Sequence, residues 1–140
     1  MKQASLALLL ILTFLIASCS KKEEVDPREQ YVGEYAMHSA RVQRTGTKVD
    51  NDIIEWTLKV SKASSADELT FSDGSETYTV RLNGSSFTIN KFVVLLQQNN
   101  AILGFDVTGD GSFNGKKVNL SQLMTGINIT VTLSSIGEKP

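Results

Sequence analysis

Apolar and polar residues alternate along most of the chain after Tyr31, and this period of two predicts β-strands. In the segment IEWTLKVS, residues 54–61, each apolar side chain is followed by a polar or charged one. Strict alternation over such a length is typical of antiparallel strands that have one buried and one solvated face. The same pattern predicts further strands over residues 68–73, 77–83, 86–90, 104–109, 117–123 and 127–135.

Glycine-containing pairs separate these segments and predict tight turns. Asparagine or aspartate followed by glycine is favoured in two-residue hairpin loops, because glycine readily supplies the positive φ that such loops need. Favoured pairs occur at Asp73-Gly74, Asn83-Gly84 and Asn114-Gly115, and a weaker one occurs at Thr125-Gly126.

The number and spacing of the strands favour a closed sheet. Residues 91–101 are apolar at successive positions and fit either a buried strand or a short helical turn; Phe92, Val93 and Val94 favour the strand. The resulting eight or nine strands form an antiparallel up-and-down meander, which has two exposed edges unless it closes. We therefore predict an all-β barrel, with a two-sheet β-sandwich as the alternative. Such a barrel is either filled by side chains or holds one small ligand.

The first residues have the composition of a signal peptide. Lys2 precedes an apolar run of 14 residues, Ala4 to Ala17. A membrane-spanning helix needs roughly 20 such residues, so the run is too short to span a bilayer but suits a secretory signal. The alternatives are an ordinary signal peptide and one that ends at a modified cysteine.

The segment Ile16-Ala17-Ser18-Cys19 resembles the lipobox of bacterial lipoproteins. This resemblance implies cleavage before Cys19, acylation of its sulfur and new amino group, and attachment to a membrane through these acyl chains. Cys19 is the chain's single cysteine. We expect residues 1–18 to be a signal peptide, residues 19–30 to be the lipidated cysteine and a flexible tether, and residues 31–140 to form the barrel.

Lys22-Glu23-Glu24 resembles an acidic signal that follows the lipidated cysteine in lipoproteins of the Bacteroidetes and directs them to the outside of the outer membrane. A solvated linker explains the same residues. The expected location is therefore the cell envelope, on a lipid anchor in the outer membrane, with both the periplasmic and the cell-surface side left open.

The stretch DPREQYVGEY, residues 26–35, followed by seven or more strands, resembles the small lipocalin-like lipoproteins of Bacteroidetes. The later GDGSFNGKKVNLS, residues 109–121, is similar to a glycine-rich hairpin common in them. Gly33-Glu34-Tyr35 is similar to the opening Gly-x-Trp of lipocalins, with Tyr35 in place of the tryptophan. The resemblance implies that the glycine bends the first strand and that the aromatic plugs one end. Lipocalins also pack a basic residue from late in the barrel on that aromatic, and the predicted last strand, 127–135, contains none. The resemblance implies a lipocalin-like β-barrel.

Charge and residue types exclude several classes of function. Without Lys2, the chain has 13 basic and 15 acidic side chains, a formal charge of −2. This balance gives no electrostatic basis for binding nucleic acid. With Cys19 acylated, no thiol is left for a disulfide, a metal site or a nucleophile. His38, the one histidine, is interpreted as a strand-surface residue, since a zinc site needs further ligands.

Residues 106–112 partly match a calcium-binding loop, with oxygen-bearing Asp106, Thr108 and Asp110 before Gly111. Position 12 of such a loop requires a bidentate glutamate, and Lys117 occupies it. A glycine-rich connection between strands, with Gly109 at a bend or bulge, explains the same residues. We expect no metal and no cofactor.

Trp56, Tyr78 and Phe105 are the candidate ligand-binding residues. Aromatic side chains at alternating positions either line a cavity for a small apolar ligand or glycan, or fill a barrel that has no cavity. The first reading predicts a lipid-anchored binding module. The second predicts a structural lipoprotein that engages another envelope protein through its outer face. No nucleophile, base and orienting group can be assembled, so an enzyme is not expected.

Overall fold

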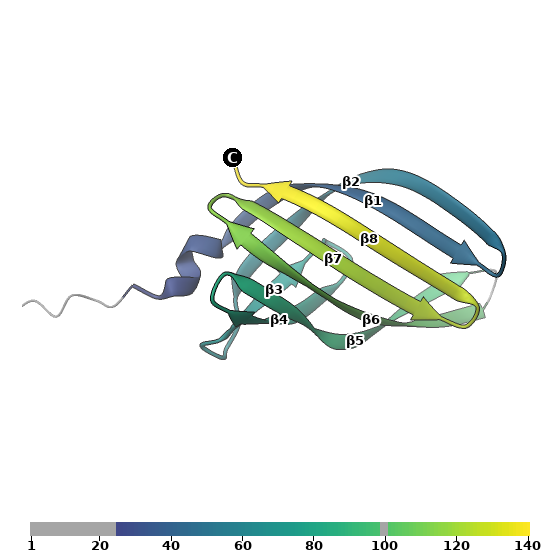
Figure 1. Ribbon diagram of the computed structural model, residues 1–140. Coiled ribbons are helices and arrows are strands. Elements are labelled where there is room, and N and C mark those ends of the chain that lie inside the picture. Colours follow the sequence, from purple (N-terminus) through teal and green to yellow (C-terminus); the bar gives the residue numbers. More distant parts are fainter. Residues whose placement is uncertain (1–24, 99–100) are drawn as a thin grey trace, which may run out of the picture.

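The computed structural model describes residues 25–98 and 101–140, which form a closed, all-β barrel of eight antiparallel strands (Figure 1). The predicted fold class is confirmed, and the sandwich alternative is wrong. The elements are η1 (Pro27–Tyr31), β1 (Gly33–Thr45), β2 (Lys48–Lys62), β3 (Glu68–Ser72), β4 (Thr77–Asn83), β5 (Ser86–Gln98), β6 (Ala101–Asn114), β7 (Lys117–Gly126) and β8 (Ile129–Glu138).

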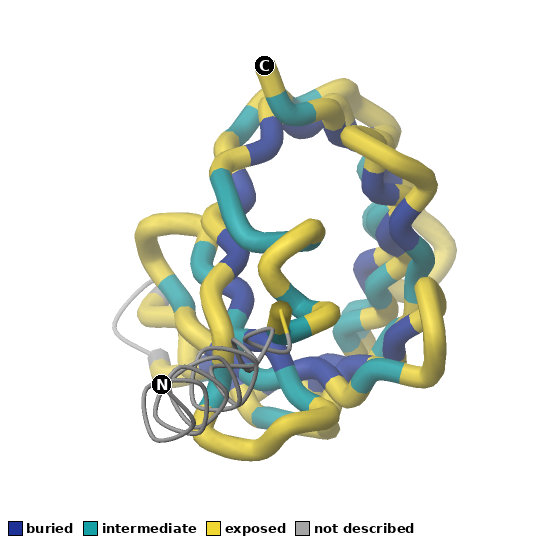
Figure 2. Tube along the Cα trace, turned by 90° about the vertical axis from the view of Figure 1, so that its left-hand side faces the viewer, coloured by how far each residue is buried: buried dark blue, intermediate teal, exposed yellow. Residues whose placement is uncertain are grey.

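The strands follow the order of the sequence around the barrel, and β8 pairs with β1 to close it. This last ladder runs from Ala36 opposite Glu138 to Thr45 opposite Ile129. Every strand is therefore hydrogen-bonded to its neighbours along the chain, as the short turns predicted. Figure 2 shows buried and exposed positions alternating along the strands that ring the interior.

The turn predictions are confirmed at three of the four sites. Gly74, Gly84 and Gly115 all have positive φ. The predicted turn at Thr125-Gly126 is wrong, because both residues continue β7. The turn lies at residues 127–128, where Asn128 has a φ of 61°. Asparagine tolerates this left-handed conformation better than most residues.

The ambiguous segment after residue 90 is a strand, and it continues β5 across a bulge. Ile89 pairs with Gly109, whereas Phe92 pairs with Val107, so two residues of β5 face one residue of β6. The extra residue shifts which side chains point inward. Before the bulge the odd-numbered Phe87 and Ile89 are buried, and after it the even-numbered Val94 is buried.

Gly109 and Gly111 lie inside β6, not in a connection between strands as the sequence suggested. A Cβ at Gly111 would collide with the ring of Phe87 and the carbonyl oxygen of Asn119. Glycine at this position lets a large aromatic side chain lie directly against the neighbouring backbone. The bulge lies on β5 at residues 90–91, opposite Thr108 of β6.

The strands differ greatly in length. β3 and β4 contain 5 and 7 residues, whereas β2 contains 15 and β5 contains 13. β2 pairs with β3 only over Lys59–Lys62, and β5 pairs with β4 only over Ser86–Ile89. Within the described residues, the facing edges of β2 and β5 therefore have no ladder partner at residues 48–58 and 90–97. The barrel wall therefore has eight strands at the η1 end, whereas β3 and β4 do not reach the other end and six strands remain there.

The packed core occupies the half of the barrel that has all eight strands. Phe71 is fully buried there, and its ring lies 5.0 Å from that of Phe87 and 6.2 Å from that of Phe113. Tyr31 of η1 stacks on Phe113 with ring centroids 4.3 Å apart. The 3-10 helix thus covers the end of the core at which the chain enters the barrel.

A basic residue does pack on the plugging aromatic, and it lies just beyond the last strand. Lys139 Nζ is 5.4 Å from the ring centroid of Tyr35 and donates hydrogen bonds to the carbonyl oxygens of Gln30 and Val32 at 2.8 and 3.2 Å. Gly33, whose φ is +141°, leaves room for the lysine stem, since an added Cβ would lie 3.0 Å from Lys139 Cδ. Lys139 lies outside the predicted last strand, 127–135, because β8 extends to Glu138 and Lys139 follows it.

Replacing Lys139 with methionine is expected to lower the free energy of unfolding by about 1–2 kcal/mol. Methionine keeps an apolar stem but removes the two hydrogen bonds and the cation–π contact. Denaturant unfolding measures the difference. The control is Lys117→Met, at an exposed lysine on β7, with an expected change within about 0.5 kcal/mol. Equal changes in the free energy of unfolding at the two lysines would show that the contacts of Lys139 do not stabilise this end of the barrel.

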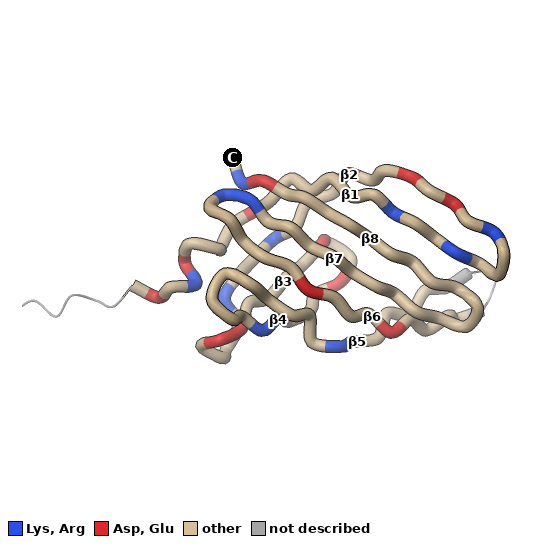
Figure 3. Tube along the Cα trace, in the orientation of Figure 1, with Lys and Arg blue, Asp and Glu red and all other residues tan. Residues whose placement is uncertain are grey.

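Acidic and basic residues are interspersed over most of the surface (Figure 3). Residues 118–137, which form most of β7 and β8, contain no charged side chain. In the parts of the chain that the structure describes, no helix is both long and apolar enough to cross a membrane.

Candidate functional site

The six-stranded half of the barrel encloses two adjoining hollows. Their volumes are about 470 and 390 Å³, within the range of about 300–1,000 Å³ that is typical of small-molecule sites. Both are lined by Ile54, Leu96, Met124 and Leu133, one each from β2, β5, β7 and β8. Apolar side chains of four strands therefore form a shared belt around this part of the interior, which we call the binding chamber.

The three predicted wall residues all line the binding chamber. Trp56 and Tyr78 line the smaller hollow, and Phe105 lines the larger one. Tyr78 also belongs to the packed core, so it lies at the boundary between the two halves. Phe71 and Phe87, two further aromatic residues at alternating strand positions, belong to the packed core.

A buried hydrogen-bonded chain fixes the orientation of Trp56. Its indole Nε1 donates to Ser39 Oγ at 2.7 Å, and the Ser39 and Ser135 hydroxyls share a hydrogen bond of 2.6 Å. The two serines are 1% and 3% exposed. Buried polar groups are costly unless they are paired, so this chain holds the indole against the wall while its ring faces the chamber.

Substitution of Ser39 by alanine is expected to cost about 1–3 kcal/mol of stability, because the buried hydroxyl of Ser135 and the indole N–H of the half-buried Trp56 both lose a partner. The fluorescence of Trp56, the one tryptophan in the chain, should change as the ring loses its fixed position. Ser134→Ala, at the exposed neighbour of Ser135, is the matched control and should be nearly neutral. Thermal unfolding and emission spectra decide; an unchanged melting temperature for Ser39→Ala would remove this role.

Tyr78 is held in its neutral form beside the chamber. Burial, reinforced by the nearby Asp73 carboxylate, raises the pKa of its hydroxyl strongly. Gln122 Nε2 donates to that hydroxyl oxygen at 3.1 Å, and the ring of Phe92 stacks on Tyr78 at 4.7 Å. The phenol O–H therefore remains a hydrogen-bond donor at any physiological pH.

One ion pair lies at the wide end of the chamber. Arg41 of β1 lines the larger hollow, and its Nε donates to Asp52 Oδ1 of β2 at 2.8 Å, with a second contact from Nη2 to Oδ2. The guanidinium lowers the pKa of Asp52, and the carboxylate raises that of Arg41. The side chains are 41% and 44% exposed, so the pair lies at the rim and not in the interior.

The chamber has two openings of different character. The wide end of the barrel, between the β1–β2 and β7–β8 turns, lies opposite η1 (Figure 1). The second opening is in the side wall, where the β3–β4 turn ends short of the full barrel length, and Asp73, Ser75 and Glu76 of this turn line the smaller hollow. One rim therefore carries the Arg41–Asp52 pair, whereas the other carries two carboxylates.

Arg41 and Met124 were not identified from the sequence. Arg41 continues the inward alternation of β1 after Met37 and Ser39. Its charge hides this position in a pattern that is defined by apolar residues. Arg41 could have been placed on the inner face by counting alternate residues along the strand. The burial of Met37 and Ser39 places residue 41 on the same side of the sheet.

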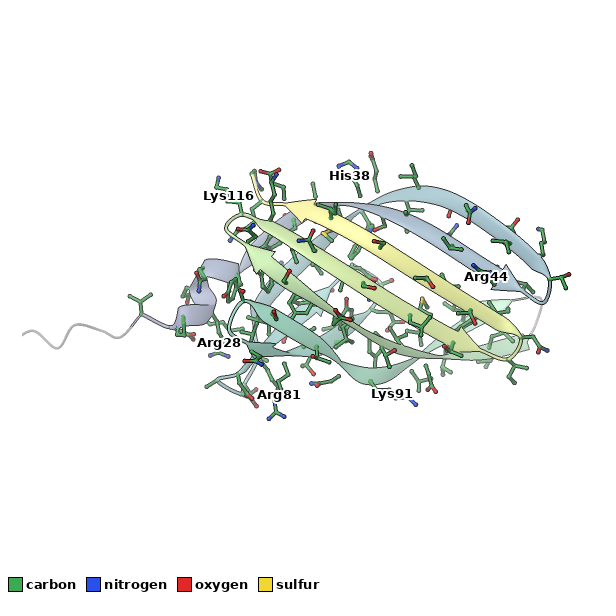
Figure 4. The ribbon with its side chains drawn as sticks, viewed as in Figure 1. Arg28, His38, Arg44, Arg81, Lys91 and Lys116 are labelled. Atoms are coloured by element: carbon green, nitrogen blue, oxygen red, sulfur yellow. The ribbon has the colours of Figure 1, made fainter. Side chains whose placement is uncertain are left out.

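His38 points away from the barrel, and its side chain is 66% exposed beside Glu55, as a strand-surface residue should be (Figure 4). Asp106 of the calcium-like stretch forms an ion pair of 2.9 Å with Lys91 on the outside of the barrel. Among residues 25–98 and 101–140, no three histidine, cysteine, aspartate or glutamate side chains are grouped closely enough for a metal ion. Cys19 lies outside the described residues.

The chain matches no protein-family model, no curated protein and no solved structure.

Proposed function

We propose that this protein is a lipid-anchored binding module of the cell envelope that holds a small apolar ligand in the binding chamber. The observation that carries the proposal is the chamber itself, an apolar space of several hundred Å³ in the half of the barrel that the core leaves empty. Apolar surface moved from water into such a space contributes roughly 25 cal/mol per Å². A glycan, which needs many hydrogen bonds, fits this lining less well.

The contact of Lys139 with Tyr35 next to Gly33 supports the lipocalin-like assignment, because the resemblance implies this arrangement at the closed end of the barrel. A barrel fold alone does not determine a function. The proposal therefore depends on the chamber and its lining, and the fold only explains why a cavity can exist there.

The proposed anchor at Cys19 would join the barrel at its closed end. The described chain begins at Val25 and enters the barrel through η1. Residues 20–26, which precede η1, reach at most about 25 Å when fully extended. The wide opening of the chamber would then face away from the anchoring membrane, where it is free to take up a ligand.

Titration with the neutral fluorescent dye Nile red tests the proposal. The dye is expected to bind with one site per chain and to increase its emission as it leaves water. Trp56 should report the same event, since its ring lines the chamber. An unchanged dye spectrum together with unchanged Trp56 emission, at dye concentrations up to its solubility, would contradict the proposal.

The second candidate is a structural lipoprotein that engages another envelope protein through its outer face. The uncharged outer surface of residues 118–137, which exposes Leu123 and Ile136, favours this candidate. A paired experiment separates the two: Leu123→Lys should weaken partner capture from the native envelope and leave dye binding unchanged. The chamber has no role in this candidate, which is why we place it second.

A further inference from the structure

We propose that the ligand is a linear amphiphile with an acidic head group, and that Arg41 binds this head at the wide opening while the hydrocarbon tail fills the chamber. This inference rests on the proposed function and specifies its ligand class. It is carried by the position of one guanidinium among described lining residues that are otherwise uncharged and mostly apolar.

Asp52 uses only part of the hydrogen-bonding capacity of Arg41. A guanidinium has five N–H donors, and Asp52 takes two of them through Nε and Nη2. Arg41 lines the larger hollow, whereas Asp52 does not. The carboxylate therefore binds the edge of the guanidinium formed by Nε and Nη2, and the other N–H donors remain for a carboxylate or phosphate in the hollow that Arg41 lines.

The remaining charges orient such a ligand. Of the residues that line the two hollows, Arg41 is the one basic side chain, and the acidic ones are Asp73 and Glu76 at the side opening. An anionic head is attracted to the first opening and repelled from the second. The neutral amides of Gln43 and Gln97 beside Arg41 add hydrogen-bonding groups at the same rim.

The lining between the two rims suits a hydrocarbon chain. It passes from Leu103 and Phe105 to the belt of Met124 and Leu133 and ends at Trp56. No charged side chain interrupts this path in the described residues. With its head at Arg41 and its tail directed inward toward the packed core, the ligand would place its acidic group against the guanidinium and its hydrocarbon chain against apolar side chains.

Displacement of Nile red by dodecanoic acid and by 1-dodecanol compares two ligands that have similar tails and different heads. Wild-type protein in detergent-free buffer at pH 7.5 is expected to bind the acid at least about tenfold more tightly, a difference of ~1.4 kcal/mol. Arg41→Gln should abolish this preference and leave dodecanol binding unchanged. Arg44→Gln is the matched control, because Arg44 is an exposed arginine on the same strand (Figure 4).

Asp52→Asn gives a second test with the opposite sign. Removing the competing carboxylate frees the guanidinium, so the affinity for dodecanoate is expected to rise severalfold. If Arg41 served only to hold β1 against β2, both substitutions would weaken binding of acid and alcohol alike. Equal affinities of wild-type protein for the two ligands would overturn the inference and leave the proposed function intact. Failure of both ligands and of Nile red to bind would overturn the proposed function itself.

Discussion

Phe71→Ala is expected to lower the free energy of unfolding by about 3–5 kcal/mol, the range for removing a large aromatic side chain from a close-packed core. Phe71 is fully buried, and three aromatic rings lie around it. Truncation would leave a cavity that these rings cannot fill without leaving their rotamers. Chemical denaturation followed by circular dichroism measures the loss.

Phe105→Ala is the matched control, because Phe105 is also only 4% exposed but lines the binding chamber. Its ring already lacks packing partners on the chamber side, so its removal forfeits fewer contacts. We expect roughly half the cost of Phe71→Ala. Equal losses of stability at the two positions would mean that both halves of the barrel are packed to the same density, and would contradict a packed half next to an open one.

Leu133→Trp is expected to abolish binding of Nile red, with a loss of at least about tenfold in affinity, while the protein stays folded. Leu133 lines both hollows, so a larger side chain at this position fills the space in which the ligand would lie. Filling an empty apolar cavity need not cost stability, unlike enlarging a residue in a packed core. Dye titration and thermal unfolding together separate blocking from misfolding.

Thr132→Trp provides the control, since Thr132 is the exposed neighbour of Leu133 on the outer face of β8. It adds the same indole to the protein outside the chamber, and dye binding should remain at the wild-type level. If Leu133→Trp bound the dye as well as wild type, the ligand site would have to lie elsewhere on the barrel.

The alternation of side chains was enough to predict the barrel, because one apolar face per strand and short turns leave closure as the natural way to remove sheet edges. The extents of the strands were less accessible. The segment 86–90 and the apolar run after it were separate in the sequence pattern, because the bulge at residues 90–91 shifts the inward parity from Ile89 to Phe92. A bulge changes the parity of a strand without changing its composition.

Trp56, Tyr78 and Phe105 could be predicted as interior residues, but not which of the aromatic positions border empty space. Phe71 and Phe105 occupy the same kind of alternating position, and only the lengths of the neighbouring strands distinguish them. β3 and β4 end before the chamber, so nothing from these strands fills it. The pairing of Arg41 with Asp52 depends on the register of β1 and β2, which the alternating pattern does not fix.

A crystal structure of the protein under xenon pressure will show whether the binding chamber is empty. Xenon enters apolar cavities that are not filled by side chains or water. We predict xenon density in the chamber between Phe105, Met124 and Leu133, and none beside Phe71. Absence of xenon from the chamber, with Trp56 and its neighbours packed across the interior, would contradict the claim that half of this barrel is open to a ligand.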